Sequence, residues 1–223
     1  MNSFMVKKLI QKDWFMCRHG VYLCLLIGFG GLISFLLGGF YSVYLGAVAL
    51  DLAVIMLMFF QTLGIIFERK DQTLAFIMSL PVSNLEYTMA KTIAYGGGYF
   101  FTWLLLYISA IAVLMIRIDI GNSIIPYFTV LYGSVLMFYC LGFAVAMITE
   151  SEPLTSAVLA LGNITTQVSI GLGMTFPEIK ESIRSPTILW NEPIVTVLAI
   201  EMIVAVLSLT AMFYFQLRKK DFL

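Results

Sequence analysis

Two carboxylates, Asp51 and Glu201, stand inside long apolar stretches of the chain, where an ionised side chain is costly to bury. Both lie about seven to eight residues from the ends of their predicted helices on one side of the membrane, which at about 1.5 Å per residue gives them similar depths. One interpretation is a pair that binds protons or cations. The other is that each carboxylate is solvated from an external vestibule or bonded to hydroxyl groups of a neighbouring helix. The sequence does not decide between these two interpretations.

The chain carries few residues suited to enzymatic chemistry. It has one histidine, His19, and therefore no pair of histidines at metal-binding spacing. The three cysteines, Cys17, Cys24 and Cys140, match neither a metal-binding nor a disulfide pattern. No glycine-rich phosphate loop ending in Lys-Ser or Lys-Thr occurs. We therefore expect no enzymatic activity, cofactor or metal in this chain, and any work driven by ATP must be done by another chain.

The composition is that of an integral membrane protein. Hydrophobic residues make up 61% of the 223 positions and charged residues only 12%, far from the balance found in soluble domains. A helix that spans the bilayer needs about 20 mostly apolar residues, so the chain has room for about six spans and no separate soluble domain. The formal net charge of zero offers no basic surface to a nucleic acid.

We predict an all-α integral membrane protein whose residues 1–223 form a single transmembrane domain. An interfacial amphipathic helix covers residues 1–18. In it Asp13 projects into the apolar face, either as a solvated carboxylate or a partner of Arg18, or with a specific functional role. Three consecutive glycines predict a kink or a close helix contact at residues 96–98. The six predicted spans cover about residues 20–40, 43–66, 87–115, 124–148, 154–174 and 194–215.

The distribution of basic residues predicts the orientation. Lysines and arginines concentrate in the two ends of the chain and in the loop after the second span, so the positive-inside rule places both termini in the cytoplasm. The loop over residues 67–86 is then cytoplasmic. The loop over residues 175–193 is external, and its pattern predicts a short interfacial or re-entrant helix.

Two predicted spans carry features of close helix packing. Gly30, Ser34 and Gly38 form a small-xxx-small ridge in the first span. The fifth span is the least hydrophobic, and we expect it to face protein or a polar cavity rather than lipid. Its hydrogen-bonding side chains include Asn163, Thr166 and Gln167.

The cytoplasmic loop begins with charges, among them Glu68 and Arg69, which we expect at the exposed rim of a contact surface. An amphipathic stretch follows, and the spacing predicts a short helix that ends before the proline. Its apolar residues are Leu74, Ile77, Met78 and Pro81. Ser83 and Glu86 then match a capping box, so a new helix begins there. By pattern alone, the short helix either lies flat on the membrane or docks on a partner protein.

This loop resembles the signature cytoplasmic loop of ABC-2 type transporter permeases, with its acidic and basic start, a Ser-Leu-Pro-Val-Ser core at 79–83 and Ala90-Lys91 opening the next span. Asn84 departs from the pattern, since many relatives have Arg there. Leu9, Lys12 and Asp13 resemble the start of a subgroup that includes exporters of bacterial peptide toxins. The resemblance implies an ABC-2 fold, like that of type V exporters, in a plasma membrane of bacterial type.

The resemblance further implies a permease that pairs with a second copy or a homologous permease and binds separate ATPase subunits, which hold ATP and Mg²⁺. The 67–86 loop would be a coupling helix in a groove of the ATPase, with Glu68, Arg69, Leu74, Ile77, Met78 and Pro81 as coupling residues. The dimer seam or translocation path would include Gly30, Ser34, Gly38, Asn163, Thr166 and Gln167. The implied cargo is an amphipathic peptide, a lipid-like molecule or a drug moved outward.

Three competing hypotheses stay open. An ion-coupled secondary transporter would use Asp51 and Glu201, and it would predict internal repeats, of which the sequence shows none at the residue level. A membrane scaffold or sensor would have no need for a polar fifth span. Haem-export permeases share the length and layout, but their loop is less similar to this one.

Overall fold

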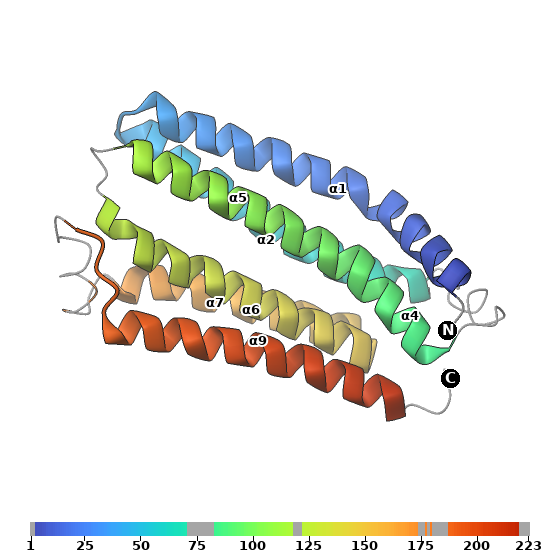
Figure 1. Cartoon of the computed structure of the whole chain (residues 1–223). Helices are drawn as coiled ribbons and strands as arrows, with labels where there is room; N and C mark the ends of the chain where they lie inside the picture. The colour runs from blue at the N-terminus through green and yellow to red at the C-terminus, as the bar shows by residue number, and fades with distance from the viewer. Residues whose placement is uncertain are drawn as a thin grey trace.

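The computed structural model of the chain describes residues 3–70, 83–117, 122–173, 177, 179 and 187–218. This part of the chain is helical and contains no strand. The long helices run side by side as one bundle, and α1 begins at the same end of the bundle at which α9 ends (Figure 1). The main helices are α1 (Ser3–Leu37), α2 (Phe40–Lys70), α4 (Asn84–Lys91), α5 (Gly97–Ile116), α6 (Ile125–Thr149), α7 (Glu152–Gly173) and α9 (Glu192–Arg218).

Five of the described helical segments are long and apolar enough to cross a membrane. They are Phe4–Leu37, Tyr41–Glu68, Asn84–Ile116, Ile125–Thr149 and Glu192–Arg218. Many of their exposed side chains are large and apolar, such as Leu26, Phe101 and Val206, which suits a surface that faces lipid. The chain is therefore compatible with a multi-pass membrane protein. The segment predicted as the fifth span forms α7, which has 22 residues but is not among the five.

The predicted interfacial helix is not separate from the first span. Its residues continue into that span as the single helix α1. No proline interrupts this stretch, and the helix continues through Gly20. A Cβ atom on Gly20 would lie 3.2 Å from the Phe60 ring of α2, so the glycine serves helix packing rather than a helix end.

A π-helical turn, Thr92–Gly96, joins α4 to α5, so that the two form one rod. It directly precedes Gly97 and Gly98, in the region where the three glycines predict an irregularity. A Cβ atom on Gly98 would lie 3.3 Å from the Trp14 ring of α1, so this glycine also allows a close helix contact. The turn is the kind of single-turn bulge that commonly interrupts α-helices at functional sites.

Two groups of helices make up the bundle. Helices α1, α2 and α5 pack together, and α6 packs against α7 and α9 (Figure 1). The groups meet where α6 contacts α2 and α5, where α7 contacts α2 and where α9 contacts α4. Between α5 and α6 the rings of Tyr99 and Tyr139 stack with centroids 3.6 Å apart. In the first group, α1 and α2 approach closely at Gly31 and Gly46, since a Cβ atom on Gly31 would lie 2.9 Å from the Gly46 carbonyl oxygen.

Candidate functional site

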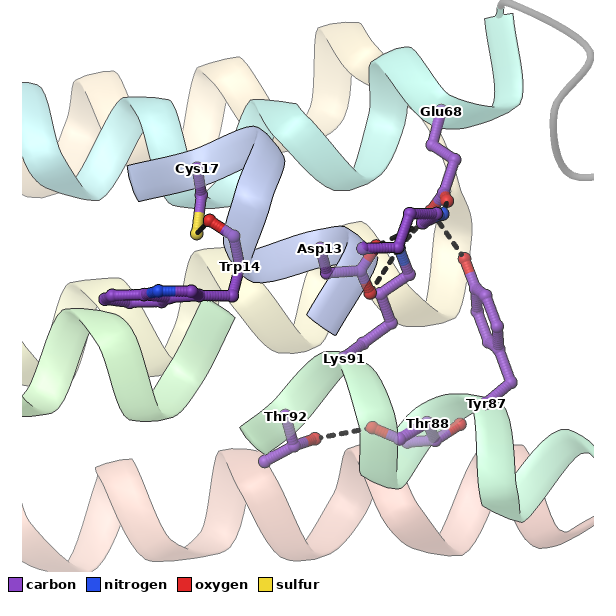
Figure 2. A network of polar contacts seen from close by, with 9 residues as sticks. Asp13, Trp14, Cys17, Glu68, Tyr87, Thr88, Lys91 and Thr92 are labelled. Carbon is purple, nitrogen blue, oxygen red and sulfur yellow. Dashed lines mark hydrogen bonds and ion pairs between the residues drawn. The ribbon is translucent and has the colours of Figure 1, made fainter. Parts of the chain in front are cut away.

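Four charged side chains from three helices meet at the end of the bundle where α2 ends and α4 begins. Lys12 and Asp13 come from α1, Glu68 from α2 and Lys91 from α4. Figure 2 shows Asp13, Glu68 and Lys91 pointing toward one another from their three helices. We call these four residues the charge cluster.

In the charge cluster, each ammonium group contacts both carboxylates. Lys91 Nζ lies 3.0 Å from each oxygen of Asp13 and also pairs with Glu68. Lys12 Nζ lies 3.2 Å from Asp13 Oδ1 and pairs with Glu68 as well. Two positive and two negative charges therefore balance, and every charge has an opposite neighbour within ion-pair distance.

Three members of the cluster are almost completely buried. Asp13 is 0% exposed, Glu68 2% and Lys91 1%, whereas the Lys12 side chain is 37% exposed. Removing such charges from water is expensive, and mutual pairing with good geometry offsets this. The ion pairs of the cluster are therefore mostly shielded from water, whereas surface ion pairs are weakened by solvent screening.

Aromatic side chains of α4 and the following turn support the buried cation. The Tyr87 hydroxyl donates to Glu68 Oε2 at 3.4 Å. Lys91 Nζ lies 5.3 Å from the ring centroid of Tyr87 and 5.1 Å from that of Tyr95, within the range of cation–π attraction. Tyr87 and Lys91 are four residues apart and so share one face of α4, which is the face turned to the cluster.

The capping box predicted from the sequence is confirmed, and it fixes the start of α4. Ser83 Oγ accepts a hydrogen bond from the backbone N–H of Glu86 at 3.3 Å, and the Ser83 N–H donates to the Glu86 carboxylate at 3.0 Å. This reciprocal pair satisfies backbone donors that the first turn of a helix leaves unpaired. The box therefore sets the register that turns Tyr87 and Lys91 toward the cluster.

Two expectations about charged residues were wrong. Asp13 is neither solvated nor the partner of Arg18, because it lies buried against Lys91, while the Arg18 guanidinium lies over the Phe15 ring at 4.0 Å. Glu68 is not an exposed rim charge, since it is buried inside the cluster. A signal was present in the sequence: an acidic residue on the apolar face of a helix needs a buried partner, and Lys91 opens an apolar span.

Most of the other predicted coupling residues lie outside the residues that the structure describes. The backbone of Arg69 belongs to α2, and its side chain is not described. Leu74, Ile77, Met78 and Pro81 lie outside the described residues, as does most of the predicted external loop over residues 175–193. Their predicted roles stay predictions.

Among the described residues, the predicted ridge of small residues contacts another helix only in part, because Ser34 bonds to Ser42 of α2 whereas Gly30 meets no neighbour. A Cβ atom on Gly30 would meet nothing within 4 Å, and Ser34 Oγ donates to the Ser42 carbonyl at 3.1 Å across the turn. Gly38 lies beyond the end of α1 with a φ of 79°, a conformation that glycine adopts readily. The close contact between α1 and α2 is made instead at the neighbouring Gly31.

The polar residues of α7 face the protein only in part, since Thr166 is buried whereas Thr165, Gln167 and Ser169 are exposed. Thr166 is buried and its Oγ1 lies 3.4 Å from Ser134 Oγ of α6. Gln167 Nε2 donates to Asp51 Oδ2 of α2 at 2.6 Å. Asn163 lines a small pocket between α2, α6 and α7 together with Thr166. These residues therefore join α7 to the two helices beside it in the same chain.

The two carboxylates of the apolar helices α2 and α9, Asp51 and Glu201, have different surroundings. Asp51 on α2 is paired with Gln167. Glu201 on α9 is 5% exposed and lies against α6, where a Cβ atom on Gly133 would be 2.5 Å from its Oε2. The structure thus brings Asp51 together with a residue of α7 and Glu201 together with α6. Within the described ranges, no group of three or more His, Cys, Asp or Glu side chains gathers in a way that would hold a metal ion.

Comparison of the chain with protein-family models, with curated proteins and with solved structures gives no match.

Proposed function

We propose that this chain is the permease subunit of an ATP-driven exporter of the ABC-2 type, with ATP hydrolysis performed by separate ATPase subunits. One observation carries the proposal. Lys12 and Asp13, from one stretch of resemblance, meet Glu68 and Lys91, from the other, in the charge cluster. A chance likeness in two short stretches would give no reason for their charged residues to contact one another.

The cluster is suited to passing a displacement from residues 71–82 into the bundle. Glu68 lies just before this segment and Lys91 just after it, and both are tied to α1 through Lys12 and Asp13. Breaking a buried ion pair by removing one partner costs about 3–5 kcal/mol, so these helix ends move together more readily than they separate. An ATPase that moved the segment would therefore move α1, α2 and α4 as a unit.

In this proposal, the apolar side chains of Leu74 and Ile77 dock in a groove of the ATPase, and the cluster end of the bundle faces the cytoplasm. A second permease copy packs on the face of α1 that carries Gly30, where space is open. Closure of the ATPase pair on ATP then shifts the paired permeases from inward to outward access. The cargo class is an amphipathic peptide, a lipid-like molecule or a drug.

Site-specific photocrosslinking tests the docking step. A benzoylphenylalanine at position 74 or 77 in cells of the native host should form an adduct with a protein that carries an ATPase phosphate loop and hydrolyses ATP. Position 101 is the matched control, since Phe101 is apolar and exposed on α5. Adducts at positions 74 and 77 no stronger than at position 101 would refute docking.

Reconstitution tests coupling. The double variant L74S/I77S should lose the stimulation of ATP hydrolysis that the wild-type chain gives to the cross-linked ATPase, because a groove that binds an apolar face discriminates against polar side chains. Normal co-purification of the ATPase together with normal stimulated turnover in this variant would overturn the proposed function.

A second candidate, ion-coupled secondary transport, is favoured by the buried position of Glu201. It expects proton flux through the chain alone in proteoliposomes, followed with an entrapped pH-sensitive dye, and loss of that flux in D51N and E201Q. If the wild-type chain shows no proton flux, or if D51N and E201Q both show the same flux as the wild type, this candidate is excluded.

A further inference from the structure

A cavity of about 250 Å³ lies between α6, α7 and α9. Its walls are formed mostly by apolar side chains that recur every three or four residues on the facing sides of α6 and α9, as helices that share a groove require. On α6 the lining residues are Tyr127, Val130, Leu131 and Ser134, and on α9 they are Pro193, Ile194, Val197 and Glu201; Ser169 of α7 and Ile179 complete the described lining. The cavity is thus an apolar site with a few polar groups, the usual character of a small-molecule site.

Among the described lining residues, Glu201 is the one with a charged side chain. Only 5% of Glu201 is exposed. Its Oε2 has no hydrogen-bond partner among the described residues. Gly133 makes room for it, because a Cβ atom there would lie 2.5 Å from Oε2. A buried carboxyl oxygen without a partner is expensive, so the site favours a ligand that supplies a hydrogen-bond donor.

Two of the three other polar lining residues, Ser134 and Tyr127, point to the same ligand chemistry, and the third is Ser169. Ser134 donates its hydroxyl hydrogen to the Leu131 carbonyl at 2.8 Å, and Tyr127 donates its own to the Ser169 carbonyl at 3.1 Å. Both hydroxyl hydrogens are therefore used within the protein. The oxygens of Ser134 and Glu201 are acceptors, and none of the described lining residues is basic.

The size of the cavity limits the ligand. At about 30 Å³ for each water molecule of the liquid, 250 Å³ corresponds to roughly eight waters, which suits a small organic molecule rather than a peptide or a whole phospholipid. An ammonium group supplies three donors and a positive charge, and a short hydrocarbon body would fill the apolar walls. An anionic ligand would instead meet the Glu201 carboxylate and acceptor oxygens.

We propose that this cavity binds a small organic cation, a primary amine with an apolar body, with Glu201 as its counterion and Ser134 as a second acceptor. The inference does not rest on the proposed function, because binding at this site requires neither the ATPase nor a second permease copy.

The test uses the full chain in nanodiscs of zwitterionic lipid and two probes of nearly equal shape, 2-phenylethylamine and the uncharged 2-phenylethanol. Isothermal titration should show saturable binding of the amine to the wild type. Binding of the alcohol, and binding of the amine to E201Q, should be weaker by about tenfold or more, as expected for the loss of a hydrogen bond to a charged group.

D51N is the matched control, since Asp51 is also an intramembrane carboxylate but is paired with Gln167. It should bind the amine as the wild type does, which separates a specific site from general attraction of cations to a carboxylate in the bundle. Equal affinity for the amine and the alcohol, no saturable binding, or an affinity unchanged in E201Q would each overturn the inference. If E201Q fails to give a monodisperse protein, the comparison of the two probes on the wild type decides alone.

Discussion

Replacing Lys91 by methionine should destabilise the protein more than the same change at Lys12, the other cation of the charge cluster. Methionine has nearly the length of the lysine stem, so the change removes the charge and leaves the packing largely filled. Asp13 and Glu68, 0% and 2% exposed, would then share only the positive charge of Lys12. Breaking a buried pair in this way costs about 3–5 kcal/mol, so we expect Lys91→Met to lower the free energy of unfolding by that amount.

Two companion variants make the reasoning specific. Lys12→Met removes a cation whose side chain is 37% exposed, and solvent-screened pairs are worth about 1 kcal/mol or less, so its effect should be several times smaller. Adding Asp13→Asn to Lys91→Met restores the balance of charges. The double variant should therefore be more stable than Lys91→Met alone, because it leaves one buried carboxylate facing the remaining cation Lys12 instead of two.

The assay is equilibrium unfolding in mixed micelles with increasing SDS, followed by far-UV circular dichroism on the four proteins under one buffer. Equal losses in Lys91→Met and Lys12→Met would show that burial does not govern the cluster. A double variant less stable than Lys91→Met would show that the buried negative charge left by that change is not the cause of its instability.

Further predictions concern helix packing and capping. Gly31→Ala should destabilise by about 1–3 kcal/mol in the same assay, because its Cβ would lie 2.9 Å from the Gly46 carbonyl oxygen. Gly30→Ala, with open space at its Cβ, should be neutral or stabilise by up to about 1 kcal/mol, and equal effects at the two positions would contradict the packing described. Ser83→Ala should lower stability by about 1 kcal/mol and speed hydrogen exchange at the Glu86 amide, which loses its acceptor; unchanged exchange there would argue against the capping box.

Local patterns predicted the helices well because the information lies within a few residues. The apolar stretches that form α2, α6 and α9 are each long enough to cross a bilayer. The capping box joins Ser83 and Glu86, which are three positions apart, so its geometry follows once the chain turns into a helix. The polar composition of α7 predicted its contacts with the protein only in part, since Thr166 is buried but Gln167 is exposed.

Local patterns failed where the deciding partner is distant in the sequence or where no stop signal exists. Nothing in the residues around Gly20 distinguishes a helix end from a helix that continues past a glycine packed on Phe60. Gly30 and Gly31 are adjacent, and only the position of α2 decides which of them lies in the contact.

By itself the sequence determined that the chain is helical and that its helices include apolar segments of membrane length. Composition and short-range spacing govern these two properties, and they also limit charged residues to few positions. Only the tertiary structure decided which charges are buried together. Asp13 and Lys91 are 78 residues apart and Lys12 and Glu68 are 56 apart, and a buried charge is tolerated only where such a distant partner arrives. That meeting depends on how α1, α2 and α4 pack, which is a property of the whole bundle.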